Sequence, residues 1–287
     1  MKKLTLLVAT AIICLTSTAQ DEKENTNKTK DTIRIGGMII VKKGKPGDVN
    51  ISIGNKKHHK NKNVSTNWGI IDLGFANYND QTNYANTGSY LINRPGYPAL
   101  DKNDFKLKTG KSVNVNLWLF MQRINLIKHY VNFKYGLGVE LNNYRYKSNI
   151  NYNENGLVPY TVNTQTNAAF IFRDSISFSK NKLAADYITV PVMLNFTTNP
   201  FAEKKGFSLS LGVSAGYLYG QRNKQKSSER GKLKNRGDYD LEKFKFSYVA
   251  EIGMGPVRLY GSYSPNSMYE RSLDIRPYNI GFRFSNW

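Results

Sequence analysis

The chain has 287 residues, and its 41 Lys and Arg against 21 Asp and Glu give a formal net charge of +20. This length suits one sizeable domain with appendages, and the lack of any apolar run of about 18 residues excludes a bundle of membrane-spanning helices. The single cysteine, Cys14, lies near the start of the chain, so the rest of the sequence has no disulfide, thiol nucleophile or thiolate metal site.

The first residues have the pattern of a secretory signal. Two lysines precede the apolar run Leu4–Leu15, and small residues follow it up to Ala19. This order is typical of a signal peptide, so we expect residues 1–20 to be removed on export. The alternative, a lipoprotein signal that uses Cys14, fits less well because Ile13 stands where a small residue is expected.

Residues 21–66 differ in composition from the rest of the chain. They are rich in Lys and Asn and contain the run NKKHHKNKN, with one short alternating stretch, TIRIGGMIIV. We interpret them as a flexible basic arm with a small hairpin around Ile33 to Ile53. Neighbouring histidines on such an arm, His58 and His59, are usually solvated, and we assign no metal site.

From residue 67 onward, segments with apolar and polar residues in alternation recur between polar stretches, as β-strands require. We expect eight strands: 68–78, 111–122, 130–145, 185–197, 206–219, 243–254, 256–264 and 275–286. In the third, one face is apolar: Val131, Phe133, Tyr135, Leu137, Val139 and Leu141. The other face is polar or small: Asn132, Lys134, Gly136, Gly138, Glu140 and Asn142.

These segments favour a barrel with its apolar face outside. The polar faces consist mostly of Gly, Ser and Asn, which suits a narrow lumen better than a solvated exterior, and the segments are long enough to cross a bilayer with tilt. The connections alternate between long (79–110, 146–184, 220–242) and short, as in outer-membrane barrels. The sequence therefore predicts an all-β protein whose residues 67–287 form an eight-stranded antiparallel transmembrane β-barrel. An even strand count places both termini, and the basic arm, in the periplasm.

Aromatic residues near the segment ends predict a girdle at the membrane interfaces. They are Tyr130, Tyr144, Tyr217, Tyr219, Tyr263, Tyr278 and Trp287.

The second half of the chain resembles a known family. Lys182-Leu183 followed by YITVPVMLNF is similar to a signature of the PorT-like outer-membrane β-barrel proteins of Bacteroidota, and GFSLSLGVSAGYLYG, FSYVAEIGMGPVRLYGSYS and YNIGFRFSNW resemble the strands that follow it. The resemblance implies an eight-stranded barrel in the outer membrane of a Gram-negative bacterium. It implies little about activity, although the family's named member assists a secretion and gliding apparatus. Because proline cannot donate to a ladder, we expect a bulge at Pro191.

The inferred inward faces carry a nearly balanced set of charges, expected to form a lumen charge network: Asp72, Lys134, Glu140, Lys245, Glu251, Arg258 and Arg283. The interior of an eight-stranded barrel is just wide enough for side chains to fill. Together with Trp118, Phe120 and Met193, these charges predict a plugged lumen and a scaffold, with a narrow pore as the alternative.

The segment 220–242 is strongly basic. Its cations suggest an anion-binding loop for surface polysaccharide or lipopolysaccharide phosphate: Lys224, Lys226, Arg230, Lys232, Lys234 and Arg236. The alternative is a solvated loop whose lysines only maintain solubility. An exported protein does not routinely meet nucleic acid, so we expect no nucleic-acid partner.

The histidines argue against catalysis. None follows His129, and neither a His–Asp protease nor a Ser–His phospholipase can be assembled at the external rim. We therefore expect a non-enzymatic barrel without cofactors that binds or anchors something. Its expected partners are outer-membrane lipid, lipopolysaccharide and the barrel-assembly machinery during insertion. The alternative is a role as an accessory component of an envelope secretion or transport machine, with an envelope protein partner.

Overall fold

The computed structural model describes residues 32–35, 38–42, 49–52, 63–200, 206–254 and 257–285. It divides into two compact units, 1–60 and 61–287. In the first unit, β1 (Thr32–Ile35), β2 (Met38–Lys42) and β3 (Val49–Ser52) pair antiparallel in that order. One hairpin was expected here, and the structure has a third strand. The predicted signal peptide, the rest of the arm up to residue 62 with the His58–His59 pair, and Trp287 lie outside the described residues, whereas residues 64–66 of the predicted arm belong to the strand that begins at Val64.

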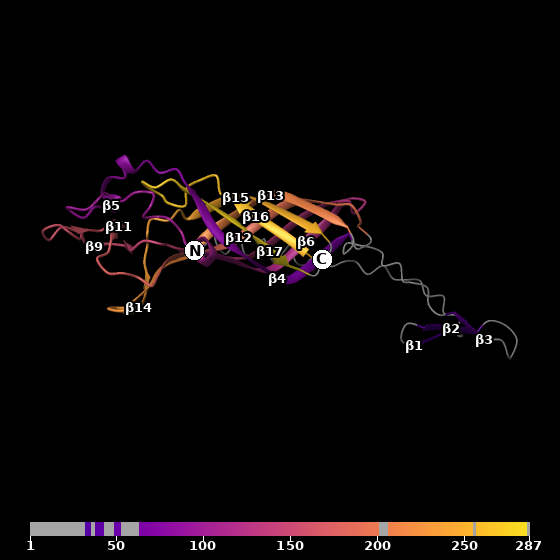
Figure 1. Ribbon diagram of the computed structural model, residues 1–287. Coiled ribbons are helices and arrows are strands. Elements are labelled where there is room, and N and C mark those ends of the chain that lie inside the picture. The colour runs from indigo at the N-terminus through magenta and orange to yellow at the C-terminus, as the bar shows by residue number, and fades with distance from the viewer. Residues whose placement is uncertain are drawn as a thin grey trace, which may run out of the picture. The chain divides into compact units, whose positions relative to one another are not determined.

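In the second unit, eight strands close into a ring. In chain order they are β4 (Val64–Asp80), β6 (Val113–Ile127), β7 (Val131–Arg145), β12 (Lys180–Thr197), β13 (Phe207–Ser227), β15 (Phe244–Met254), β16 (Val257–Tyr263) and β17 (Ile275–Phe284). Each pairs antiparallel with its neighbours in the order β12-β7-β6-β4-β17-β16-β15-β13, and a β12–β13 ladder closes the circle (Figure 1). Closure leaves the ring without an edge, so strand backbone groups find partners in adjacent strands.

The ring is apolar outside and polar inside. On β7, the even-numbered residues are buried while the odd-numbered ones are partly exposed. The outward-facing positions of the ring expose large apolar side chains: Trp68, Leu73, Phe75, Leu117, Ile188, Leu194, Val213, Phe246, Ile280 and Phe282. A water-soluble protein rarely exposes so continuous an apolar surface. The outward positions from Ile188 to Phe196 on β12 and from Phe207 to Tyr219 on β13 mark the membrane-spanning part of those strands.

Two local expectations about the strands were wrong. The β6–β7 register shifts between Trp118 and Phe120, which turns Phe120 out of the lumen and puts Met121 inside instead. At Pro191 the β12–β7 register is the same on both sides, so no bulge forms there. The β12–β13 register shifts instead between Asp186 and Tyr187, and the extra residue is Tyr219 on β13.

The expected aromatic girdle holds for Tyr130, Tyr217, Tyr219, Tyr263 and Tyr278, which are all substantially exposed. Tyr144 is an exception, since it is only 1% exposed and packs inside. Its even position on β7, in phase with the buried Asn142, gives the reason.

The long connections fold into a cap at one end of the barrel (Figure 1). We use cap for residues 81–112, 146–179, 228–243 and 264–274. Its short elements are η1 (Tyr84–Asn86), η2 (Gly88–Tyr90), β5 (Leu91–Ile92), η3 (Thr109–Lys111), β8 (Ile150–Asn153), β9 (Gly156–Leu157), β10 (Gln165–Thr166), β11 (Phe170–Arg173) and β14 (Gly231–Arg236). β11 joins β8 and β5 in one sheet, and β14 pairs with the end of β13 beyond the ring.

Short connections occupy the other, terminal end, where residues 63 and 285 also lie. The turn from β6 to β7 places Lys128 and His129 at φ 45° and 63°, so both residues adopt the left-handed region that tight hairpin turns use. No helix in the described residues is long and apolar enough to cross a membrane.

Candidate functional site

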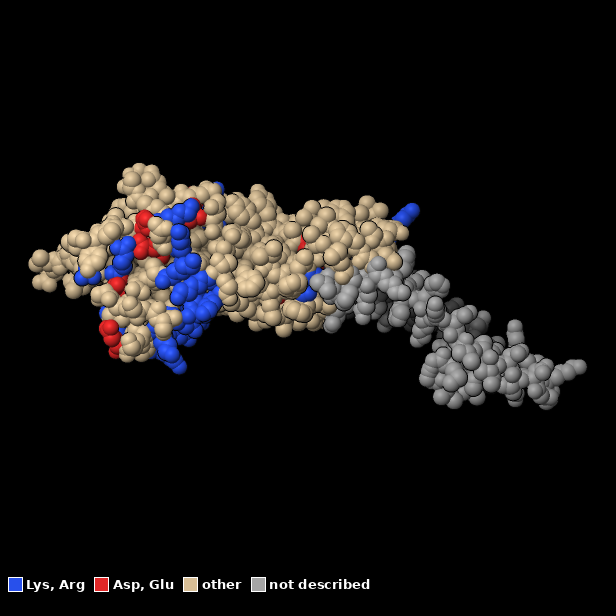
Figure 2. All heavy atoms as spheres, in the orientation of Figure 1, with Lys and Arg blue, Asp and Glu red and all other residues tan. Residues whose placement is uncertain are grey.

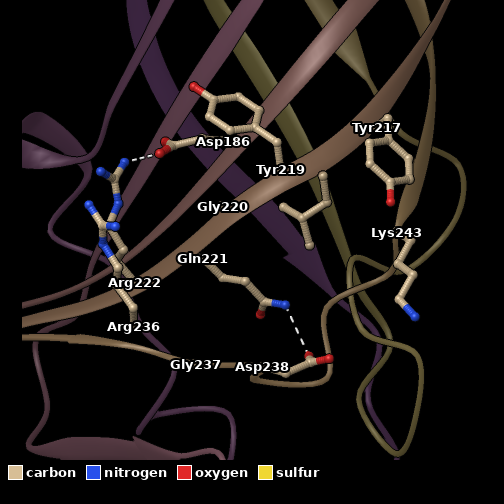
Figure 3. Close-up of a pocket in the computed structure, with 11 residues that line it drawn as sticks. Asp186, Tyr217, Tyr219, Gly220, Gln221, Arg222, Arg236, Gly237, Asp238 and Lys243 are labelled. Atoms are coloured by element: carbon tan, nitrogen blue, oxygen red, sulfur yellow. Dashed lines mark hydrogen bonds and ion pairs between the residues drawn. The ribbon is translucent and has the colours of Figure 1, made fainter. Parts of the chain in front are cut away.

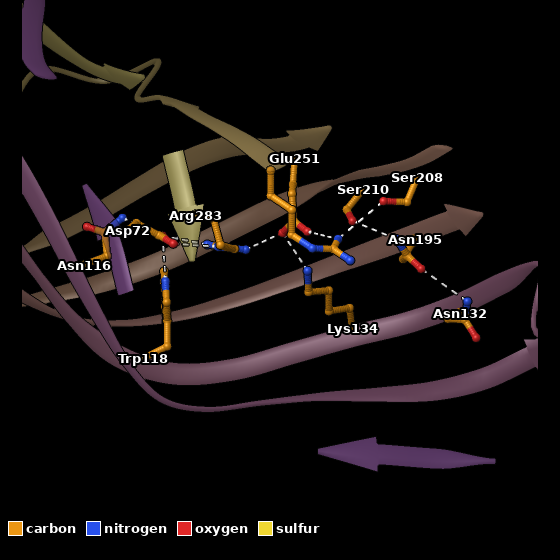
Figure 4. A network of polar contacts seen from close by, with 11 residues as sticks. Asp72, Asn116, Trp118, Asn132, Lys134, Asn195, Ser208, Ser210, Glu251 and Arg283 are labelled. Carbon is orange, nitrogen blue, oxygen red and sulfur yellow. Dashed lines mark hydrogen bonds and ion pairs between the residues drawn. The ribbon is translucent and has the colours of Figure 1, made fainter. Parts of the chain in front are cut away.

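The seven charges assigned to the lumen from the sequence are all buried, and they form two clusters of ion pairs. Figure 4 shows the cluster around Arg283 and Glu251. Arg283 on β17 lies at the centre of one cluster. Its Nε and Nη2 donate to Asp72 Oδ1 and Oδ2 at 2.7 and 2.8 Å, and its Nη1 pairs with Glu251. Asp72 also accepts hydrogen bonds from Trp118 Nε1 at 2.7 Å and Asn116 Nδ2 at 3.1 Å. Every buried charge in this part of the lumen therefore has an opposite charge as a direct partner.

Glu251 on β15 connects three cations. Besides Arg283, its carboxylate pairs with Lys134 Nζ at 2.6 Å and Arg258 Nη1 at 3.0 Å. The side chain of Glu251 is 1% exposed, and that of Lys134 is equally buried. Because the ion pairs join β7, β15, β16 and β17, they tie together opposite sides of the ring.

Glu140 forms a second cluster nearer the cap. Its carboxylate pairs with Lys245 and accepts hydrogen bonds from Asn142 Nδ2 at 2.9 Å and Asn279 Nδ2 at 3.1 Å. Side-chain amides link the two clusters across the lumen. Asn114 Nδ2 donates to the side-chain oxygens of both Asn116 and Asn142, at 2.9 Å each.

The network fills the barrel. A cavity bordered by Trp118, Thr189 and Met193 has a volume of about 30 Å³, room for one or two waters. Packing elsewhere is tight enough to require glycine: a Cβ on Gly281 would lie 2.3 Å from the carbonyl oxygen of Leu73. The part of the lumen that the structure describes is thus a packed polar core.

The cap contains a second buried core, above the lumen network, which the sequence analysis did not predict. Buried tyrosines bond through their hydroxyls: Tyr152 Oη lies 2.6 Å from Tyr146 Oη on the same connection and 2.8 Å from Tyr269 Oη on another. Tyr90 Oη donates to the Tyr239 carbonyl at 2.8 Å. From the sequence, only the segment 220–242 was given a solvated loop as an alternative. In the structure, buried residues of the cap share one core with the end of the barrel.

The predicted anion-binding loop is a β-hairpin formed by the end of β13 and by β14. Its cations align with others on β7 and β12, and we call the whole set the basic strip: Arg145, Lys180, Lys182, Arg222, Lys224, Lys226, Lys232, Lys234 and Arg236. The predicted Arg230 is not in the strip, because its Nη1 pairs with Asp174 at 2.8 Å. Arg145, Lys180, Lys182 and Arg222 were not predicted, since only strand pairing places them beside the hairpin.

Next to the basic strip, the outer wall is hollowed by a pocket of about 420 Å³ (Figure 3). Tyr217 and Tyr219 line it on the membrane side, and Arg222, Arg236 and Lys243 line it on the cap side. Two acids also border the pocket. Asp186 pairs with Arg222, and Asp238 accepts a hydrogen bond from Gln221 Nε2 at 3.0 Å.

The residues described in the structure include no group of three or more metal-ligating side chains. Of the histidines, only His129 is described, and it lies at the terminal end of the barrel, away from the cap.

A closed antiparallel ring with an apolar exterior and a polar, ion-paired interior defines a transmembrane β-barrel. The model of the family described as outer membrane protein beta-barrel domain matches residues 101–266, more than half of the chain. The protein belongs to this family, and the family implies a location in the outer membrane.

Comparison with solved structures finds similarity to Ail and to a porin. Ail, the attachment invasion locus protein of Yersinia pestis, is 15% identical, with 76% of this chain and 98% of Ail covered at a TM-score of 0.28. Ail in complex with the heparin analogue sucrose octasulfate gives the same identity and TM-score. A mutant porin of Rh. blastica is 8% identical over 77% of this chain and 99% of the porin, at a TM-score of 0.17. No curated protein matches the sequence.

Proposed function

We propose that this protein is a non-enzymatic, membrane-anchored platform that holds the cap at the cell surface and binds an anionic partner there. The observation that carries the proposal is the lumen network. Buried ion pairs that span the ring leave no room for a solute path in the described part of the lumen, so the barrel serves as an anchor. The cap and the basic strip remain as its working surfaces.

The proposal includes the organisation expected from the sequence. Residues 1–20 act as a signal peptide, 21–66 form a periplasmic arm, and 67–287 form the barrel, which the barrel-assembly machinery inserts. With both termini in the periplasm, the cap faces outside. The supporting observation is that the long connections all lie at the end opposite residues 63 and 285.

Electrical recording tests the anchor function. The purified protein is inserted into a planar bilayer at 1 M KCl, beside a general porin as a positive control. We expect insertion without discrete single-channel currents. Sizeable, regular conductance steps would refute the plugged lumen and favour the narrow-pore alternative.

A second candidate is a role as a PorT-like accessory component of an envelope machine. The folded three-stranded sheet β1–β3 favours it, because a purely flexible arm has no need of paired strands. Deletion of residues 21–66 separates the two functions. An accessory role predicts loss of an envelope protein from cross-linked pull-downs, whereas the platform retains its anionic partner without the arm.

A further inference from the structure

The basic strip points sideways from the barrel. On β12, Leu183 is fully buried, so its neighbour Lys182 faces outward, as Ile188 and Val190 do lower on the same strand. On β13, Asn223 is fully buried, which turns Lys224 to the outside in the same way. The strip is therefore the continuation of the lipid-facing wall toward the cap.

Strand pairing places like charges directly opposite each other. Lys182 pairs with Arg145 on one side and Lys224 on the other, and Lys224 pairs in turn with Lys234. We call these four residues the central row. With strands about 4.8 Å apart, the central row extends over roughly 15 Å. A second row has the same character, with Lys180, Lys226 and Lys232 side by side.

Such an arrangement is unfavourable unless an anion compensates it, because like charges directly opposite destabilise a sheet. In the described part of the chain, one carboxylate forms an ion pair with the strip, that of Asp186 with Arg222. The pKa of Lys182 is lowered to about 8, chiefly because the side chain is partly buried and also because cations surround it. The strip carries a charge that its own fold does not neutralise.

The position of the strip favours lipid over a soluble polymer. Figure 2 shows Lys and Arg gathered in a band where the tan wall of the barrel meets the cap. Tyr217 and Tyr219 are about half exposed just below this level on β13, as aromatics at a membrane interface are. Cations directly beyond such aromatics, on a lipid-facing wall, stand at the height of lipid headgroups. A soluble polymer would reach cations on the tip of the cap more easily than cations on the wall of the barrel.

We propose that the basic strip binds the phosphate groups of lipids in the surrounding leaflet, and that the central row is its core. The proposal rests on the proposed function, whose anionic partner it identifies as phosphorylated lipid. Lysine and arginine side chains spaced along neighbouring strands can each donate to phosphate oxygens of one or two headgroups.

Native mass spectrometry of the purified full chain in non-ionic detergent tests the proposal. The probes are bis-phosphorylated lipid A, the same lipid A after removal of its phosphates, and phosphatidylethanolamine. The test variant K182Q/K224Q/K234Q neutralises three positions of the central row. The matched control K106Q/K111Q/K128Q removes the same charge at exposed lysines outside the strands. Heat-modified mobility in gels verifies that each variant is folded.

We expect the wild type and the control to retain phosphorylated lipid A in preference to the other two probes. The test variant is expected to bind it about a hundredfold more weakly, as the loss of three cations near an anionic surface predicts. Equal retention by test variant and wild type would overturn the proposal. So would equal retention of dephosphorylated lipid A, since acyl contacts would then explain binding.

A parallel titration with soluble dextran sulfate distinguishes this proposal from the proposed function. Binding of dextran sulfate that depends on the central row, without retention of lipid A, refutes the lipid partner and leaves an anion-binding platform. Binding of neither probe refutes both the lipid partner and the anionic-partner function.

Discussion

Replacement of Glu251 by Gln tests the physical basis of the sealed barrel. The carboxylate of Glu251 pairs with Lys134, Arg258 and Arg283 inside the lumen. Gln has nearly the same shape but no charge. The variant therefore removes the carboxylate that pairs with Lys134 and Arg258, while Arg283 keeps its paired contacts with Asp72.

The expected loss of stability follows from the burial of the network. Removing one partner of a buried ion pair typically costs about 3–5 kcal/mol, because the remaining charge stays desolvated. Glu251 is 1% exposed, and the Lys134 side chain cannot reach solvent without rearrangement of the lumen. We expect the E251Q substitution to lower the free energy of unfolding of the barrel by an amount within this range.

Urea unfolding in lipid vesicles, followed by tryptophan fluorescence, measures the effect. Glu270→Gln is the matched control, since it makes the same change at an exposed position of the cap. The double variant E251Q/K134M is expected to recover part of the loss, because it removes a buried cation together with the carboxylate that it pairs with. A change below roughly 0.5 kcal/mol for E251Q, within the usual range of surface substitutions, would refute the ion-paired plug.

Three further outcomes are expected. Gly281→Ala is expected to reduce the yield of folded, heat-modifiable barrel, since the new Cβ would lie 2.3 Å from a neighbouring carbonyl oxygen, whereas Gly110→Ala has open space and leaves the yield unchanged. Tyr152→Phe removes two buried hydroxyl contacts, so we expect the free energy of unfolding to fall by roughly 1–3 kcal/mol and trypsin to cleave the cap faster. Tyr97→Phe, at an exposed position, is the control and is expected to be cleaved at the wild-type rate. Burial and neighbouring cations lower the pKa of Lys182 from 10.5 to about 8, so the unfolded chain binds this proton more tightly than the folded protein does. The free energy of unfolding in anion-free detergent is therefore expected to rise between about pH 8 and 10. A Lys182→Met variant that shows the same rise would contradict this cause.

The sequence by itself was sufficient to predict a barrel and to assign its buried charges to the inward strand faces. Alternation with a period of two assigns every strand residue to one of two faces, and the polar faces contained few charges. Glu140 and Glu251 could be placed inside from parity alone, since a residue's face depends only on its position along its own strand. The same parity would have placed Tyr144 inside, had it been applied to the end of β7.

Tertiary structure decided what depends on contacts between strands or loops. Strand pairing placed Arg145 and Lys182 beside the hairpin of β13 and β14, so a basic loop became a basic strip on the barrel wall. A bulge of one residue turned Phe120 outward, and such a shift arises from the fit of two strands. The cap core joins Tyr90, Tyr152 and Tyr269 from three separate connections, and loops without periodicity give no local signal of shared burial. Periodicity within one strand is local and can be read along the chain, whereas register and loop packing are properties of pairs of segments and exist only once the ring has closed.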